Sequence, residues 1–166
     1  LDDAGDMFRN WASNPNVTKF LIWQPYTNVD DVKAYIQSCI ECYEKADYYN
    51  WVIEYKENDQ AIGNISVVEL KEHTLCTVIG YCIGEGYWHK GITSEAFSKV
   101  IEFLFEEVGV NRIESTHDVN NPNSGRVMAK CGLKYEGTLR QAGASNQGIF
   151  DCVVRSFLKS EWKQNG

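Results

Sequence analysis

The sequence predicts an α+β fold, with a mixed and mostly antiparallel central sheet that contains one parallel pair of strands and is flanked by helices. Segments 51–55, 61–70 and 75–83 are rich in valine, isoleucine and tyrosine and are separated by turn residues, which indicates a meander of three antiparallel strands. A helical stripe then extends from Ile92 to Val108, and 112–119 is a further predicted strand. A strand, a helix and a strand in this order imply a locally parallel pair inside the sheet.

Two helices are predicted before this central part, and a short helix and two strands after it. Asp2 or Asp3 can cap the first helix, on which Met7, Phe8 and Trp11 are the apolar positions. Asn28 or Asp30 can begin the second. Its apolar stripe, which predicts that Cys39 is a core residue, consists of Val32, Tyr35, Ile36, Cys39, Ile40 and Tyr43. Gly109 and Gly132 are predicted to end helices, and the last elements are a helix at 123–130 and strands at 133–140 and 149–158.

Composition narrows the class of protein. The chain has 166 residues, of which 43% are hydrophobic and 13% aromatic, which indicates one packed domain. A net charge of −7 disfavours nucleic acid as a partner, and no stretch is long and apolar enough for a membrane span. Without a signal segment the protein is expected to be soluble and cytoplasmic. Cys39 and Cys42 form a CxxC, but no second pair completes a metal site, so reduced thiols and no metal are expected.

A glycine-rich turn joins the third strand directly to the long helix at 84–94. Unpaired N–H groups at a helix start attract phosphate, and Gly91 lets the backbone approach an anion closely. Lys90 precedes Gly91, so the spacing of a Walker loop fails, and His89 stands where a dinucleotide fingerprint needs glycine. Local physics leaves an anion site and a bare turn equally open.

Three segments in this order resemble the GNAT acetyltransferase superfamily, and within it the group that contains the ribosomal-protein N-terminal acetyltransferases. The first is Ile79-Gly80-Tyr81 with 88–96, and the second is Asn121-Pro122-Asn123-Ser124 followed by Val127, Lys130, Gly132, Glu136 and Gly137. The third is Asp151 with Val153-Val154 and the closing Ser160-Glu161-Trp162. The similarity covers nearly the whole chain. It implies a single acetyltransferase domain over residues 1–166 that uses acetyl-coenzyme A as co-substrate.

The resemblance also implies which residues bind acetyl-coenzyme A. Backbone amides that hold the pyrophosphate would be those of His89, Lys90, Gly91, Ile92, Thr93 and Ser94. The strand whose backbone pairs with the pantetheine arm, and which splays from its neighbour, would be that of Tyr81, Cys82 and Ile83. Asn121 would contact pantetheine, and Ser124 would lie near the sulfur.

Function follows from the same resemblance, as transfer of an acetyl group to a primary amine by direct attack in a ternary complex. The acceptor would be a protein N-terminus or a small amine, and the protein a monomer or a homodimer. The alternative is a catalytically silent domain that binds or senses acyl-coenzyme A. Three departures from the family bear on this choice. His89 replaces a common glycine, Val78 replaces a common glutamate, and the chain opens at Leu1 without the family's first strand.

The sequence offers fewer candidate catalytic residues than candidate coenzyme-binding residues. Glu69 ends a predicted strand, where burial would make it a stronger base, and the alternatives are a solvated glutamate or a water chain to bulk solvent. Ser124 could return a proton to the leaving thiolate and also cap its helix, and the N–H of Ile83 could stabilise the oxyanion. His117, near a strand end, is interpreted as a structural or solvent-facing residue and not as a base. Aromatic residues that could wall the acceptor site, or equally lie in the core, are Tyr26, Tyr48, Tyr49 and Trp51.

Overall fold

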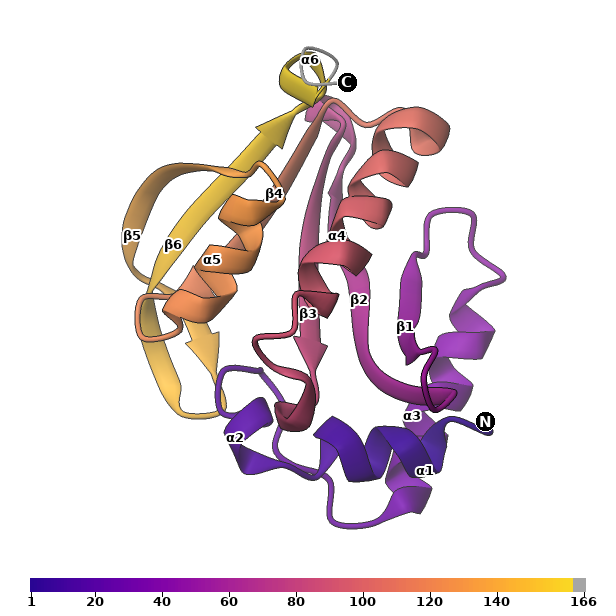
Figure 1. The fold of residues 1–166 in the computed structure, drawn as a ribbon. Coiled ribbons are helices and arrows are strands. Elements are labelled where there is room, and N and C mark those ends of the chain that lie inside the picture. Colours follow the sequence, from indigo (N-terminus) through magenta and orange to yellow (C-terminus); the bar gives the residue numbers. More distant parts are fainter. Residues whose placement is uncertain (163–166) are drawn as a thin grey trace. The chain divides into compact units, whose positions relative to one another are not determined.

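The computed structural model describes residues 1–162 and contains a six-stranded sheet with helices (Figure 1). The helical elements are α1 (Ala4–Met7), η1 (Phe8–Ala12), α2 (Pro15–Thr18), α3 (Val29–Cys42), η2 (Glu72–Thr74), η3 (Glu85–Tyr87), α4 (Ile92–Phe103), η4 (Leu104–Val108), α5 (Pro122–Lys130) and α6 (Lys159–Trp162). The strands are β1 (Asn50–Tyr55), β2 (Gln60–Lys71), β3 (Cys76–Ile83), β4 (Arg112–Asp118), β5 (Lys134–Ser145) and β6 (Gly148–Leu158).

The strand order β1-β2-β3-β4-β6-β5 confirms the predicted fold class. β1 and β2 are antiparallel, as are β4 and β6, whereas β3 and β4 form the parallel pair that the strand–helix–strand order predicts. The register of this pair extends from Cys76 opposite Arg112 to Ile79 opposite Ser115. β5 is longer than predicted and continues to Ser145.

The chain divides into two compact units, each described here by itself. Unit 1 consists of Leu1–Ser66, Tyr81–Ile92 and Ser145–Gln147. Unit 2 consists of Val67–Gly80, Thr93–Ala144 and the chain from Gly148 onward. β2 and β3 are long enough to contribute residues to both units. No helix of residues 1–162 is sufficiently long and apolar to cross a membrane.

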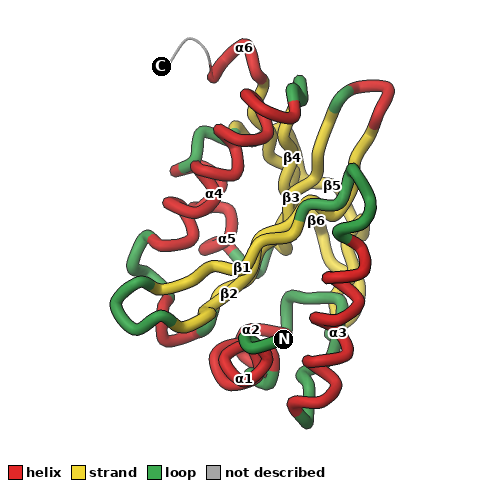
Figure 2. The backbone as a smooth tube through the Cα atoms, turned by 90° about the vertical axis from the view of Figure 1, so that its right-hand side faces the viewer, coloured by secondary structure: helices red, strands yellow, loops and turns green. Residues whose placement is uncertain are grey.

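Unit 1 has a core built by its amino-terminal helices. Met7 and Trp11 are buried, as the predicted first helix requires, and they pack with Val17, Val32 and Ala61. Figure 2 shows α1, α2 and α3 as the helices of this part of the chain. The amino-terminal helix is not a plain α-helix, because its second half, η1, has π-helical hydrogen bonding.

α3 begins where predicted, but fewer residues of its predicted apolar stripe are buried than expected. The side chain of Asn28 caps it by accepting the Asp31 N–H at 2.9 Å. Val32 is fully buried, whereas Ile40 and Tyr43 are 46% and 54% exposed. Cys39 is only partly buried, so its prediction as a core residue is wrong. The reason is that the unit 1 core contacts only the earlier turns of α3, up to Ile36.

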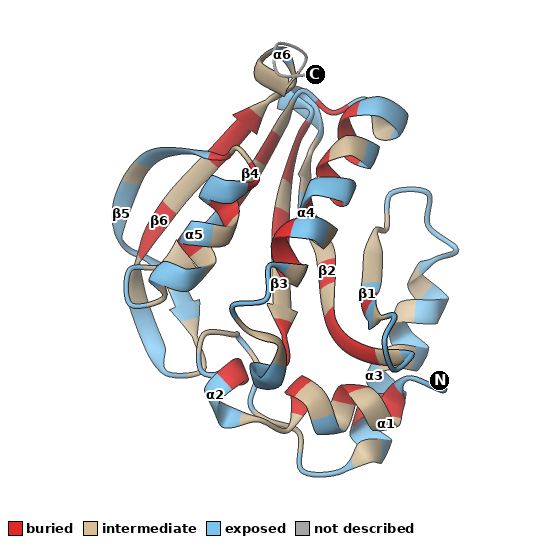
Figure 3. Ribbon diagram, viewed as in Figure 1, coloured by how far each residue is buried: buried red, intermediate tan, exposed pale blue. Residues whose placement is uncertain are grey.

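In unit 2, α5 packs on strands β4 and β6, and α4 lies on the same side of the sheet (Figures 1 and 2). Figure 3 marks the buried positions of these elements in red. Phe105 packs edge to face on Phe157, with ring centroids 5.8 Å apart. Gly109 (φ 81°) and Gly132 (φ 93°) end the helices in the left-handed region, which confirms both predicted stops.

Asn146, at the turn between β5 and β6, belongs to unit 1 and binds the loop that follows α2. Its backbone N–H donates to the Leu21 carbonyl at 2.8 Å. Its side-chain amide donates to the carbonyls of Thr18 and Trp23, both at 2.8 Å. A single amide side chain therefore donates to two backbone carbonyls, of which that of Thr18 also accepts the Leu21 N–H at 2.8 Å.

We expect Asn146→Asp to lower the free energy of unfolding by about 1–3 kcal/mol, because the carboxylate cannot donate to either carbonyl. Urea unfolding monitored by fluorescence measures this. Asn123→Asp is the matched control, since Asn123 is exposed and its oxygen accepts from Arg126 at 3.1 Å, a role that aspartate keeps. Equal stabilities of the two variants would contradict the role of Asn146.

Candidate active site

The backbone of β2 packs directly on the end of β3 within unit 1. A Cβ atom built on Gly63 would lie 2.4 Å from the carbonyl oxygen of Cys82 and 2.9 Å from the Cα of Ile83. The Gly84 N–H donates to the Ile62 carbonyl at 2.8 Å. The position of residues 81–83, predicted to pair with pantetheine, therefore depends on a glycine of the neighbouring strand.

Cys82 carries a thiol that is chemically quiet. Its Sγ donates to Oδ1 of Asn64 at 2.9 Å. Burial raises the pKa of the Cys82 thiol to about 12. The neutral form is a poor nucleophile, so this thiol does not compete for an acyl group at neutral pH.

The loop after β3 is held in shape by its own side chains. The indole N–H of Trp88 donates to the Ile83 carbonyl at 3.0 Å, which closes the chain around η3. The ring of Tyr87 packs edge to face on Tyr55 at 5.4 Å. Lys90 Nζ lies 5.2 Å from the centre of the Tyr87 ring, within cation–π range.

The tip of this loop is exposed and contains two left-handed residues, His89 (φ 61°) and Gly91 (φ 81°). Glycine adopts this region freely, and histidine is one of the residues that tolerate it. The departure at His89 therefore leaves the turn intact at the cost of some backbone strain. Left-handed residues in a turn are typical of backbone nests that present N–H groups to an anion.

In unit 2, Thr93 and Ser94 lie in the first turn of α4, and both are buried. Their backbone N–H groups lie in the first turn, where a helix has no internal acceptors. The Ser94 carbonyl accepts from Ser98 Oγ at 2.8 Å and from Cys131 Sγ at 3.3 Å. These contacts fix the start of the helix against its neighbours.

Asn121 and Ser124 both lie at the start of α5. Asn121 is the N-cap residue, and its side chain makes no capping hydrogen bond. Ser124 is inside the first turn, so the N-cap role predicted for it is wrong. The reason is Pro122, whose fixed φ suits the first helical position and moves the cap one residue ahead of it.

Glu69 is not buried as predicted. Its side chain is 59% exposed, with Lys71 Nζ 3.8 Å away. The preceding Val68 is 63% exposed, so this end of β2 extends beyond the packed part of unit 2. The catalytic role of Glu69 stays a prediction, without the burial on which it rested.

Glu114, which sequence reasoning missed, is the register partner of Val78 in the parallel pair of β4 and β3. Its carboxylate accepts from Arg112 at 2.9 Å and from Lys71 at 3.3 Å. Arg112 also forms a two-pronged pair with Glu136, at 2.6 and 2.7 Å. The carboxylate of Glu114 is thus committed to structural ion pairs.

His117 is structural, in agreement with its expected role. Its Nδ1 lies 2.8 Å from the Asp118 carbonyl oxygen, and its buried Nε2 has no hydrogen-bond partner among residues 1–162. A Cβ on Gly125 would lie 2.4 Å from that Nε2. The ring is therefore packed against the backbone of α5.

The aromatic residues proposed to wall the acceptor site have different surroundings within unit 1. Tyr26 packs against the unit 1 core. Tyr48 accepts a hydrogen bond from Asn50 Nδ2 at 3.2 Å, and burial raises the pKa of Tyr48 to about 12. Tyr49 and Trp51 stack on each other at 5.9 Å. Their role toward an acceptor stays a prediction.

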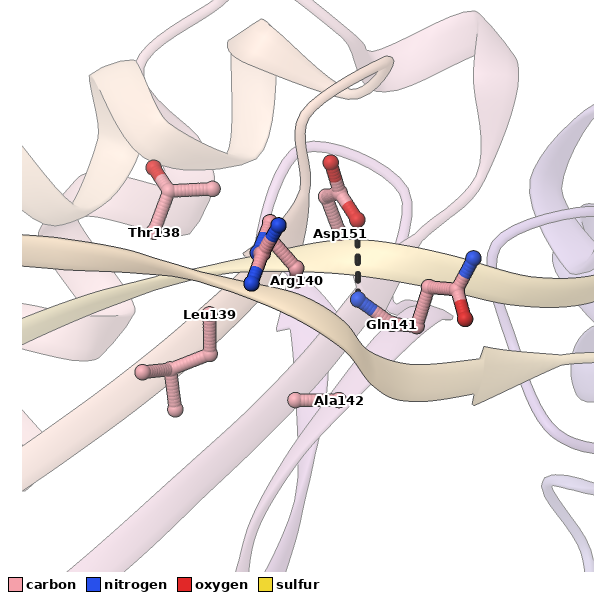
Figure 4. A pocket seen from close by; sticks show the side chains of 6 residues that line it. All are labelled: Thr138, Leu139, Arg140, Gln141, Ala142 and Asp151. Atoms are coloured by element: carbon pink, nitrogen blue, oxygen red, sulfur yellow. Dashed lines mark hydrogen bonds between the residues drawn. The ribbon is translucent and has the colours of Figure 1, made fainter.

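A polar depression lies on β5 and β6 in unit 2 (Figure 4). Asp151 Oδ1 accepts the backbone N–H of Gln141 at 2.8 Å, and Gln141 has a φ of 51°. Asp151 therefore stabilises a left-handed residue inside a strand, a role that its place in the sequence did not reveal. The depression is lined by Thr138, Leu139, Arg140, Gln141, Ala142 and Asp151.

All six cysteines are free thiols. Over residues 1–162, histidine, cysteine and acidic side chains form no group of three or more that could hold a metal ion.

Comparison with known proteins identifies the family. A family model described as acetyltransferase (GNAT) domain matches residues 1–134. The chain is 30% identical over 162 residues to the uncharacterized N-acetyltransferase p20 of Bacillus licheniformis, which covers 98% of this chain and 90% of that protein. It is 27% identical over 122 residues to the ribosomal-protein-serine acetyltransferase of Escherichia coli (strain K12), which covers 74% of this chain and 67% of that protein.

A solved structure shares the fold. It is that of the microcin C7 self immunity acetyltransferase MccE, with a TM-score of 0.82 and 23% identity over 95% of this chain and 87% of that chain. Since the family model matches most of the sequence and the p20 protein matches nearly all of it, the chain belongs to the GNAT acetyltransferase family and is an N-acetyltransferase.

Proposed function

We propose that the protein transfers the acetyl group of acetyl-coenzyme A to a primary amine, by direct attack in a ternary complex. The observation that carries this proposal is the exposed turn at residues 89–91, with left-handed His89 and Gly91 immediately before α4. Such a turn suits a pyrophosphate, because its backbone N–H groups can point at an anion. At Gly91 there is no side chain to block the approach of the ligand. The MccE protein of the same fold is described in complex with acetyl-coenzyme A and AMP.

The donor set fits this co-substrate. Amides of His89 to Ser94 would hold the pyrophosphate, and Lys90 would add a positive charge. The backbone of residues 81–83 would pair with the pantetheine arm. Asn121 would contribute its side-chain amide, which is not used as a helix cap.

The acceptor would be a protein N-terminus or a small amine. Support comes from the relative that is described as acting on ribosomal protein, and from the negative net charge of −7, which favours a cationic acceptor. An N-terminal amine and a small amine present the same nucleophile, so a panel of both kinds is needed to separate them.

The chemistry requires alignment, removal of a proton from the ammonium and stabilisation of the oxyanion. The N–H of Ile83 is the proposed oxyanion donor. Ser124 would protonate the leaving thiolate, and Glu69 or a water chain would accept the proton of the amine. The unreactive thiol of Cys82 supports direct transfer to the amine over an acyl-enzyme on this residue.

Release of free coenzyme A thiol from acetyl-coenzyme A, followed across peptides with different first residues and small amines, tests the proposal. We expect acceptor-dependent release, and raised thermal stability with coenzyme A present. Binding without turnover on any acceptor would support the silent sensing domain instead. Absence of both binding and turnover would reject the coenzyme site.

Ser124→Ala is expected to lower kcat about 10- to 100-fold with little change in the KM for acetyl-coenzyme A, because it removes a proton donor. Glu69→Gln in the same assay separates the two candidate bases. A flattened pH–rate profile would support Glu69, and an unchanged rate and profile would favour the water chain. Wild-type kinetics in the Ser124 variant would remove the serine from the mechanism.

A further inference from the structure

We propose that Glu85 is a positioning residue for the coenzyme-binding loop and acts through the side-chain amides of Asn14 and Asn16. The inference rests on the proposed function, since it explains how unit 1 fixes the loop before acetyl-coenzyme A binds. Every contact that carries it lies within unit 1.

The amino-terminal segment binds the start of β2 through polar residues four positions apart. Asp6 Oδ2 accepts the Ala61 N–H at 3.1 Å, and Asn10 Nδ2 donates to the Ala61 carbonyl at 2.7 Å. A spacing of four places these side chains on one face of a helical segment. Asn14 continues the same spacing and reaches the loop instead of the strand.

Glu85, the first residue of η3, receives this third contact. Asn14 Nδ2 donates to Glu85 Oε2 at 2.9 Å, and Asn16 Nδ2 lies 3.2 Å from both carboxylate oxygens. These two amides are the main reason that the pKa of Glu85 is lowered. Asn14 has a second task, because its Oδ1 caps α2 by accepting the Asn16 N–H at 2.8 Å.

The base of the loop has no room to shift toward the amino-terminal segment. A Cβ on Gly84 would lie 2.5 Å from the Asn10 carbonyl oxygen. The indole N–H of Trp88 donates a hydrogen bond to the Ile83 carbonyl. The segment from Gly84 to Trp88 is therefore held at both ends and at Glu85. The tip at 89–91 is exposed to solvent, with its left-handed turn already formed.

Charge explains why amides hold this carboxylate. Glu85 lies a few residues before a turn that is proposed to bind a pyrophosphate, and a negative charge free to move there would repel the ligand. Amide donors bind the carboxylate on the side of the amino-terminal segment without adding a net charge of their own. Their loss would release both the loop and the charge.

The test uses Asn14, because its two roles can be separated. Serine and aspartate cap a helix about as well as asparagine. Asn14→Ser keeps the cap and removes the donor to Glu85, whereas Asn14→Asp keeps the cap and places a second carboxylate against Glu85. We expect the KM for acetyl-coenzyme A to rise about three- to tenfold in the first variant and further in the second, with kcat nearly unchanged.

In the double variant Asn14→Asp with Glu85→Gln, residue 85 carries the amide donor and residue 14 the carboxylate acceptor, the reverse of the wild type. This variant is expected to return the KM for acetyl-coenzyme A toward the wild-type value. Amide hydrogen exchange across 85–91 should increase in Asn14→Asp and recover in the double variant, while exchange in α4 stays unchanged. Asn14→Asp combined with Glu44→Gln, at an exposed residue of the loop after α3, has the same net charge as the double variant and should not recover the KM.

Outcomes distinguish this inference from the proposed function. If the wild type does not bind acetyl-coenzyme A in calorimetry, the proposed function fails. If the wild type binds and Asn14→Asp binds equally well, or if the double variant is worse than Asn14→Asp, the positioning role of Glu85 is overturned. A change in kcat with an unchanged KM would also contradict it.

Discussion

Gly63→Ala is expected to lower the free energy of unfolding by about 2–3 kcal/mol, because the new methyl group overlaps backbone atoms that cannot rotate away. Its Cβ would lie 2.4 Å from the Cys82 carbonyl oxygen and 2.9 Å from the Ile83 Cα. The end of β3 must move to relieve these contacts. Since the same residues are proposed to pair with pantetheine, acetyl-coenzyme A binding should weaken at least tenfold even at temperatures where the variant is folded.

Urea unfolding and calorimetry with acetyl-coenzyme A measure the two effects separately. Gly86→Ala is the matched control, because a Cβ at Gly86 meets no atom within 4 Å. We expect this control to change stability little, although it lies in the loop that is proposed to bind the coenzyme. A Gly63→Ala protein as stable as the Gly86→Ala protein would show that the close approach of β2 to β3 is absent.

Arg112→Met is expected to lower the free energy of unfolding by about 2 kcal/mol, less than for a fully buried pair because solvent screens part of the interaction. Arg112 is 21% exposed, and it joins Glu114 and Glu136, which are 17% and 43% exposed. Without Arg112, the carboxylate of Glu136 keeps the hydrogen bond that Ser156 Oγ donates to it at 2.6 Å. Glu114 keeps Lys71.

The same variant should change the pH dependence of stability. Hydrogen bonds from Arg112, and then from Ser156, lower the pKa of Glu136 from its ordinary 4.5 to about 2. A lowered pKa in the folded state means that this stabilisation is complete above pH ~4.5 and is lost as the pH falls toward ~2. In Arg112→Met, the stability curve should therefore be flatter across this window.

Lys71→Met is the control for the loss of one positive charge from the same cluster. Lys71 is 40% exposed and bonds Glu114 but not Glu136 in the described structure. Lys71→Met should lower the free energy of unfolding less than Arg112→Met does. It should also leave unchanged the pH dependence of stability that comes from Glu136. Parallel pH curves for the wild type and Arg112→Met would contradict the assigned cause of the Glu136 pKa.

Much of the fold could be predicted because local signals and tertiary packing agree. The parallel pair followed from strand, helix and strand in succession, and glycines 109 and 132 marked helix ends that the structure confirms. Cys39 and Glu69 were misplaced because periodicity shows which residues share a face but not how far a neighbouring element covers that face. At Cys39 the unit 1 core ends too early along α3, and at Glu69 the strand extends past the packed part of unit 2.

The candidate site was predicted unevenly. The turn before α4 could be found, because glycines, a lysine and a helix start are adjacent in sequence. Contacts between distant residues could not, such as those of Glu85 with Asn14 and Asn16 across about 70 positions. One signal was available: Asp6, Asn10 and Asn14 recur at a spacing of four between the apolar positions Met7, Phe8 and Trp11. The left-handed backbone at Gln141 could not be predicted from its residue type. The hydrogen bond from the Gln141 N–H to Asp151 accounts for it.

The contacts of Asn146 have a consequence for how the chain is made. This residue is separated by 128 positions from Thr18, whose carbonyl it satisfies. During synthesis the loop after α2 leaves the ribosome long before Asn146 does, so until then it lacks the donors of this residue. Unit 1 includes Ser145–Gln147, so a prematurely terminated product that ends before Asn146 leaves the Trp23 carbonyl to water and the loop to quality-control proteases.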